Sequence, residues 1–299
     1  MSKVIPTTSQ WSVLRANAPL TIFYLSLATT ITGLVGLVRW YLTGDIETVA
    51  AFFRYPNAFF TLLFTGAEAG FTLYASRQFG SKDVFRRVWK LLSAAAVAHF
   101  IGRLLAVVSI GDRLPGWNPL LSQAGQVIGG PVQMCLLLLA MANAVWSFRQ
   151  LAVYRPLKRI DFVLLAIVCA LTMRTMLGIH QFLAGTGHAT WDRVLLWASD
   201  PLLMLLLAVA IVIRRSIADT HGMLANCWRA YIAAIVLMSI GDASLWCASC
   251  SNFELWNSLG WYIWLIADAA FALAPAFQVA AIERVQMRTR LFRQIALAR

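Results

Sequence analysis

The sequence predicts an all-α, polytopic membrane protein with eight transmembrane helices. Hydrophobic residues make up 60% of the chain and charged residues 13%, against roughly 45–50% and about 25% in typical soluble domains. Several apolar segments approach the roughly 20 residues that a helix needs to cross a hydrocarbon core of about 30 Å. Basic residues alternate between the connections that join these segments. Together, the three observations exclude a soluble fold.

Each predicted span is an apolar segment that ends at polar or basic residues. In chain order, the spans are residues 19–42, 49–76, 88–110, 120–148, 162–184, 194–213, 231–250 and 255–282. The first segment starts too late, and is too long, for the apolar region of a signal peptide, so we interpret it as a span. Tryptophan and tyrosine at the span ends indicate aromatic belts at the two membrane surfaces.

The distribution of lysine and arginine predicts the orientation, because these residues are retained on the cytoplasmic side. Most of them, 19 of 25, fall in residues 1–18, 77–90, 149–159, 214–229 and 284–299. The opposite connections hold only Arg39, Arg113 and Arg193, with Arg54 at the start of a span. This alternation predicts that both termini are cytoplasmic.

The chain therefore divides into a cytoplasmic segment, 1–18, an eight-helix bundle, 19–283, and a basic cytoplasmic helical tail, 284–299. We expect it in the inner membrane of a bacterium. The net charge of +12 indicates orientation and attraction to anionic lipid on the cytoplasmic side rather than nucleic-acid binding.

A possible internal repeat relates the helices that return to the cytoplasm. They begin with "RYPNAFFTLLFTG", "GGPVQMCLLLLAM", "SDPLLMLLLAVAI" and "ADAAFALAPAFQV". The positions Pro56, Pro131, Pro201 and Ala269 are 75, 70 and 68 residues apart, and proline is tolerated in the first turn of a helix. Four helix hairpins fit this spacing.

Five ionisable residues lie within predicted spans, where they are costly and are default candidates for function. They are Arg103, Arg174, Asp200, Asp242 and Asp268. Counted from the cytoplasmic anchors at about 1.5 Å per residue, all five lie roughly 20–24 Å from the inner boundary. We expect Asp242 to meet Arg103 or Arg174. The layer is either a set of ion pairs that fixes the helix register or an outward-opening pocket for a small cationic or zwitterionic ligand, with a proton site as a variant.

A second polar pair, Glu68 and His99, is predicted at about 13 Å from the inner boundary on consecutive helices. The two side chains are within hydrogen-bonding reach of each other in this arrangement. Axial ligation of haem or chlorophyll by His99 is the alternative, but His180, His188 and His221 map near or outside the interfaces and supply no second ligand. A core histidine satisfied by hydrogen bonds is favoured, and the sequence identifies no cofactor.

The cysteines do not form a disulfide framework. Cys247 and Cys250 have C-x-x-C spacing at the outer end of a span, which makes them a candidate redox pair in an oxidising compartment; the alternative is two packing cysteines. Motifs such as H-E-x-x-H, a Gly-rich phosphate loop or G-x-S-x-G do not occur. The sequence therefore predicts no metal site and no catalytic residue, and it favours a protein that is not an enzyme.

The stretch "GDASLWCASCSNFELWNSLGWYIWLIADAAFALAPAFQ", residues 241–278, is followed by the basic helical end "RLFRQIALAR". Together they resemble the last two spans and the exit helix of the membrane-integral sensory input modules of bacterial diguanylate cyclases and histidine kinases. The resemblance implies a sensory bundle whose exit helix leads to a cytoplasmic output domain. No such domain follows in this sequence, and no residue role is carried over.

Three interpretations of function follow. The first is a sensory or small-ligand-binding module without catalytic activity, which passes a signal through its C-terminal helix. The second is a small-molecule or proton-coupled transporter that uses the same charged layer. The third is an accessory subunit of a respiratory or photosynthetic membrane complex. Expected partners are membrane lipids and either a second copy of the chain or a membrane-complex partner.

Overall fold

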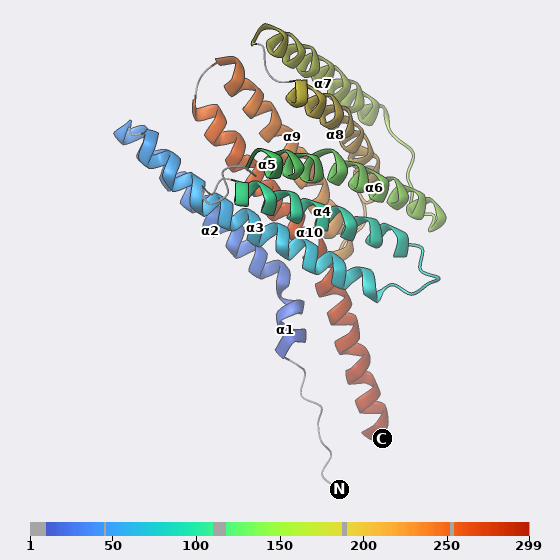
Figure 1. Cartoon of the computed structure of the whole chain (residues 1–299). Helices are drawn as coiled ribbons and strands as arrows, with labels where there is room; N and C mark the ends of the chain where they lie inside the picture. Colours follow the sequence, from blue (N-terminus) through green and yellow to red (C-terminus); the bar gives the residue numbers. More distant parts are fainter. Residues whose placement is uncertain (1–9, 45, 110–117, 187–189, 252–253, 299) are drawn as a thin grey trace.

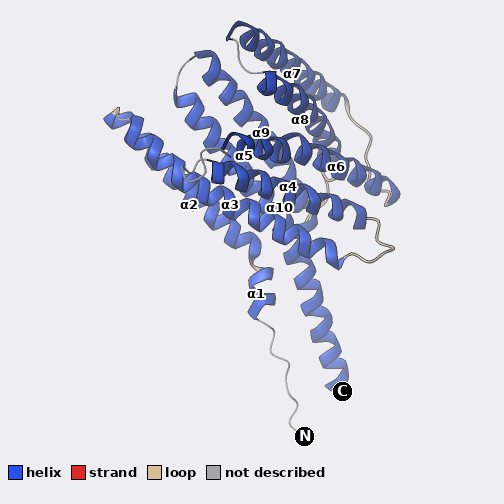
Figure 2. Cartoon of the chain, in the orientation of Figure 1, coloured by secondary structure: helices blue, strands red, loops and turns tan. Residues whose placement is uncertain are grey.

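The computed structural model is helical throughout the part of the chain that it describes (Figure 1 and Figure 2). It describes the backbone of residues 10–44, 46–109, 118–186, 190–251 and 254–298, and the side chains at most of these positions. Within these ranges there are helices and turns but no strand. The predicted all-α class is confirmed.

Short connections join the helices. In chain order, the elements are α1 (Gln10–Ala16), α2 (Ala18–Thr43), α3 (Ile46–Gln78), α4 (Arg86–Ser109), α5 (Asn118–Val127), η1 (Ile128–Val132), α6 (Gln133–Gln150), α7 (Arg159–Thr186), α8 (Thr190–Ser216), α9 (Met223–Ser251) and α10 (Glu254–Ala298). Each apolar segment predicted from the sequence falls within these helices, except that the third was predicted to end at Ile110, one residue beyond the described end of α4. The largest difference at a helix start is in α9, which begins before the predicted Tyr231 because Cys227 and Trp228 are already buried in the core.

Six helical segments of the described chain are long and apolar enough to cross a membrane. They are Ala18–Thr43, Asn57–Gln78, Arg86–Ser109, Pro119–Gln150, Met223–Ser244 and Leu259–Arg293. The chain is therefore a membrane protein by the length and composition of its helices, as the sequence predicts.

Helix α10 lies at the centre of the bundle. It packs most extensively on α9 and α3, and it also contacts α2 and α1. Its buried face is largely alanine, at Ala267, Ala269, Ala272, Ala274, Ala276 and Ala280. Small side chains let helix backbones approach closely, which favours association in apolar surroundings. The composition of α10 thus explains how one helix is packed on several sides.

Helix α7 lies at the margin of the bundle (Figure 1), where it packs mainly on α8. Large apolar side chains on it are exposed, among them Phe162, Leu171 and Leu177. Helix α2 likewise exposes Phe23 and Val35. Such faces suit hydrocarbon or another apolar surface rather than water.

A π-helical turn, η1, separates α5 from α6. It contains Pro131, which has no N–H to donate, and a π turn adds one residue to an α-helix. Helix η1 contacts α4. A Cβ placed on Gly102 would lie 2.5 Å from the backbone nitrogen of Gly129 and 2.9 Å from the carbonyl oxygen of Gly125. The backbones of α4 and η1 therefore meet where only glycine fits.

Replacing Gly102 with alanine is expected to destabilise the bundle, because the added methyl group overlaps the backbone of η1. Overpacking of this kind lowers the free energy of unfolding by about 1–3 kcal/mol. Gly70→Ala in α3 is the matched control, since a Cβ there meets nothing within 4 Å. Melting temperatures in one detergent compare the variants, and equal values would contradict the close approach of α4 to η1.

Candidate functional site

Three helices bring four ionisable side chains into one buried network. Helix α3 supplies Glu68, α4 supplies His99 and Arg103, and α10 supplies Asp268. His99 and Arg103 are four residues apart, so successive turns of α4 present them on one face. Trp264 and Asp268 share this spacing on α10.

His99 lies at the centre of the network, between two carboxylates. Its Nδ1 atom is 3.0 Å from Oε2 of Glu68, and its Nε2 atom is 3.3 Å from Oδ1 of Asp268. The same Oδ1 atom is 3.5 Å from a terminal nitrogen of Arg103. The Arg103 guanidinium lies 4.7 Å from the centre of the Trp264 ring, in a cation–π contact. The contacts form a continuous chain from α3 through α4 to α10.

The network is almost fully enclosed by protein. The side chains of Glu68, His99 and Asp268 are 5%, 3% and 3% exposed, and that of Arg103 is 19% exposed. All four lie within the helical segments that are apolar enough to cross a membrane. Ionised groups are tolerated in such surroundings when they are paired. The pairing therefore explains how these residues can be buried here.

The two contacts of His99 together require one proton more than a neutral imidazole and two ionised carboxylates contain. A neutral imidazole has one N–H and one lone pair, and an ionised carboxylate only accepts. Both ring nitrogens of His99 face carboxylate oxygens. Both contacts are attractive only if the imidazole carries two protons or one carboxyl group is protonated. In either form, the net formal charge of the network is zero, and it becomes −1 when the proton leaves.

The charged region continues from the network toward α9 and α8. Asp242 of α9 interacts electrostatically with Arg103 and with Asp200 of α8, and it lies beside Trp264. Asp200 and Asp242 are partly buried. The glycine before Asp242 makes room for this tryptophan, since a Cβ on Gly241 would lie 2.7 Å from the indole nitrogen.

The structure therefore groups Arg103, Asp200, Asp242 and Asp268 in one region but leaves Arg174 outside it. Arg174 is exposed on α7, a helix that packs mainly on α8 at the margin of the bundle. The prediction used position along the helix axis, which says nothing about the direction of a side chain. No ion pair of Arg174 occurs among the described side chains.

The Glu68–His99 pair and the charged layer are predicted as two groups, but the structure joins them. His99 is only one turn below Arg103 on α4, about 6 Å along the axis, and its ring reaches Asp268. The two predicted groups are one network. Trp264 was not predicted as a member, although its position four residues before Asp268 on the same helix was a signal for it.

The side chains of the predicted redox pair, Cys247 and Cys250, lie outside the described part of the structure. Cys135, Cys169 and Cys227 are free thiols. Among the described residues, no group of three or more potential ligands is arranged to hold a metal ion. Axial ligation by His99 would require one of its two carboxylate contacts to break.

A second buried carboxylate on α10, Glu283, was not singled out from the sequence. It is 1% exposed, and its Oε1 atom accepts a hydrogen bond of 2.6 Å from the Tyr74 hydroxyl. The Nε atom of Arg15 lies 2.6 Å from the same oxygen, and the Arg15 guanidinium lies over the Tyr74 ring. The cluster joins α1, α3 and α10. The sequence offered one sign of this cluster, because Glu283 is the only acidic residue in the basic stretch "AIERVQMRTR".

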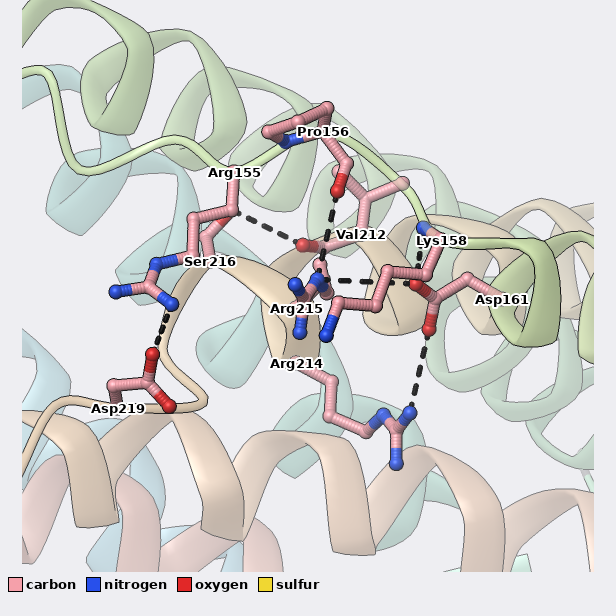
Figure 3. A network of polar contacts seen from close by, with 9 residues as sticks. All are labelled: Arg155, Pro156, Lys158, Asp161, Val212, Arg214, Arg215, Ser216 and Asp219. Atoms are coloured by element: carbon pink, nitrogen blue, oxygen red, sulfur yellow. Dashed lines mark hydrogen bonds and ion pairs between the residues drawn. The ribbon is translucent and has the colours of Figure 1, made fainter.

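Figure 3 shows a polar network where α7 begins and α8 ends. The Asp161 carboxylate accepts a hydrogen bond of 2.8 Å from the backbone N–H of Lys158, as in a capping box. It also accepts one of 3.3 Å from Arg214, and Nε of Arg215 lies 4.0 Å away. The Lys158 N–H, followed by the Arg214 guanidinium, holds the pKa of Asp161 below its ordinary value.

The sequence matches no family model, and no curated protein or solved structure is significantly similar to it. A functional assignment therefore depends on the chemistry of the site.

Replacing Asp268 with alanine is expected to lower the free energy of unfolding by about 3–5 kcal/mol, because His99 and Arg103 lose the carboxylate that they share. Asp219→Ala is the control, since it removes a carboxylate that pairs with Arg155 at the surface, where a pair contributes about 0–1 kcal/mol. Thermal unfolding in one detergent measures both. A loss in Asp268→Ala no larger than in the control would refute the buried network.

Replacing Asp161 with asparagine is expected to lower the melting temperature at neutral pH but to have little effect in strong acid. Because the folded-state pKa of Asp161 is lowered, its ionised form stabilises the fold above the ordinary aspartate pKa of about 3.9. This stabilisation is lost as the pH falls through the lower, folded-state pKa. The test measures the melting temperatures of the wild type and of Asp161→Asn from neutral pH downward. If the difference between them does not shrink on acidification, the charge of Asp161 does not stabilise the fold.

Proposed function

We propose that the chain is a sensory module of a bacterial inner membrane, in which the His99 network detects a change in protonation or in a bound small ligand. In this proposal, eight helices cross the membrane as four hairpins, with α5, η1 and α6 forming one crossing, and both termini are cytoplasmic. The observation that carries it is that Asp268 lies on the same continuous helix as the exposed basic segment after Glu283.

The length of α10 supports a role in transmission. It contains 45 residues, which corresponds to about 68 Å at 1.5 Å per residue, more than twice a hydrocarbon core of about 30 Å. Its C-terminal part projects from the bundle at the same end as α1 (Figure 1). Arg284, Arg288, Arg290 and Arg293 on this part are exposed. A displacement of α10 at Asp268 would therefore reach a segment that is accessible to a partner.

Loss of the extra proton supplies a physical cause for such a displacement. An unprotonated ring nitrogen facing the Asp268 carboxylate is repelled by it, and the network then carries an uncompensated negative charge. Helix α10 is also held by Glu283, 15 residues further along. A stimulus that binds one protonation state more tightly than the other shifts the population between them. Helix shifts of about 1–2 Å are common in such transitions.

Two further features agree with this proposal. Residues 241–278 resemble the sensory input modules of bacterial signalling proteins, whose exit helix leads to an output domain. The exposed apolar faces of α2 and α7 are the surfaces that the proposal assigns to lipid, a second copy of the chain or a membrane partner.

Spin labels test the proposal directly. Cysteines are introduced at Leu291 and Gln150, both exposed, in a background without native cysteines, and the label distance is measured in lipid nanodiscs. Raising the pH is expected to shift this distance by about 1–2 Å, because the network releases its proton. In Asp268→Asn the shift should disappear, since the amide donates to Nε2 of a neutral His99 and no extra proton is held.

Asp219→Asn, a surface carboxylate outside the network, is the control and should respond as the wild type does. An unchanged distance in the wild type across the titration of the network would sink the proposal that α10 reports its state.

A proton-coupled transporter is the second candidate, and the π-helical turn favours it. Gly129 of η1 lies against Gly102, next to Arg103 of the network, and π turns inside helices often occur at functional sites. The same purified protein, reconstituted in vesicles, distinguishes the two candidates. Proton flux that Asp242→Asn abolishes would favour the transporter, whereas a distance response without flux would favour the sensor.

A further inference from the structure

A pocket of about 320 Å³ opens between the end of α8 and the start of α9. It is lined by Arg214, Arg215, Ile217, Ala218 and Arg229. The side chains of Arg214 and Arg215 are 54% and 18% exposed, and Arg229 is exposed as well. The pocket is separate from the His99 network and shares no residue with it.

Positive charge predominates in the pocket. Among the described side chains, Asp161 is the carboxylate that pairs with the lining, through Arg214 and Arg215, so one paired carboxylate offsets the charge of three arginines. The nearby Asp219 is paired with Arg155 instead (Figure 3). Two positive charges are therefore left over, which matches the charge of a phosphate dianion or of two phosphodiesters.

Protein contacts hold the three guanidinium groups in place but leave most of their donors available. Arg214 uses one terminal nitrogen for Asp161, and Arg215 uses Nε for the carbonyl oxygen of Pro156. Arg229 donates to the Asn226 side chain and to the carbonyl oxygen of Thr220. Each arginine has five N–H donors in a rigid fork that suits phosphate oxygens. The pocket is thus preorganised for an oxyanion.

The position of Arg229 distinguishes this pocket from ordinary helix capping. Arginines in the last turn of a helix interact favourably with its free carbonyl groups, which accounts for Arg214 and Arg215 at the end of α8. Arg229 comes from the second turn of α9, where that explanation does not apply, and it lines the same pocket. Arg214 directly follows the apolar part of α8, so the pocket lies at the level of lipid head groups in the proposed orientation.

We infer that the Arg214–Arg215–Arg229 pocket binds a phosphoryl group, carried either by an anionic phospholipid of the cytoplasmic leaflet or by free phosphate. The inference does not depend on the sensory role of the His99 network.

The test titrates the purified full chain in a neutral detergent with two probes, short-chain phosphatidylglycerol and inorganic phosphate, at constant ionic strength. Thermal stability reports binding. Arg229→Gln is expected to raise the apparent Kd of whichever probe binds by roughly tenfold, because one charge-assisted hydrogen bond is lost. Arg87→Gln, which changes an exposed arginine of α4 that does not line the pocket, is the charge-matched control. Arg214→Gln serves as a second variant in case the loss of the Arg229 contact with Thr220 prevents folding.

In both supporting outcomes, the pocket variants lose the stabilisation and Arg87→Gln keeps it. If only phosphatidylglycerol stabilises the protein, the phosphoryl group belongs to a phospholipid. If inorganic phosphate stabilises it, the ligand is free phosphate. Equal titration curves for the pocket variants and Arg87→Gln, or no stabilisation of the wild type by either probe, would overturn the inference.

Discussion

A charge buried among apolar side chains must be paired, and this requirement sets the relative positions of α3, α4 and α10. His99 connects the three helices, since each of its ring nitrogens contacts a carboxylate from a different helix. Sliding or rotating any one of the three helices by a turn would leave an ion without a partner. Close steric fits, such as Gly241 against Trp264, also define the register. The polar contacts add a directional requirement to it, because each ion must meet its partner.

Helix α10 combines close packing with buried charge. Its alanine-rich face allows close packing on α9 and α3, and it also carries Asp268 and Glu283, which pair with residues of other helices 15 positions apart along it. Small side chains let the helix backbones approach closely, and the two carboxylates fix which residues of α1, α3 and α4 lie beside α10. In the proposed sensory role, these polar contacts are the ones that a change in protonation would alter.

The fold was predictable from the sequence to a much greater extent than the site. Helix positions follow from apolar length and from the placement of Lys and Arg, which are properties of single segments. The site depends on side-chain direction and on neighbours, which a single sequence does not contain. Arg174 illustrates the first difficulty, since it was grouped with the other four residues by its position along the chain but is exposed on α7. Glu283 illustrates the second, because the partners of this buried acid, Arg15 and Tyr74, come from helices distant in the chain.

The additional residue in η1 changes what the rest of its helix can touch. One inserted residue rotates everything that follows by about 100° relative to what precedes it. On the near side of the insertion, Gly125 faces α4; beyond it, α6 buries Leu137, Met141 and Ala144 against both α4 and α8. Without the additional residue, the side chains of α6 that are buried toward α4 and α8 would be turned by about 100° about the helix axis. A change of one residue in chain length here therefore reorients every side chain of α6 together, which no single side-chain substitution can do.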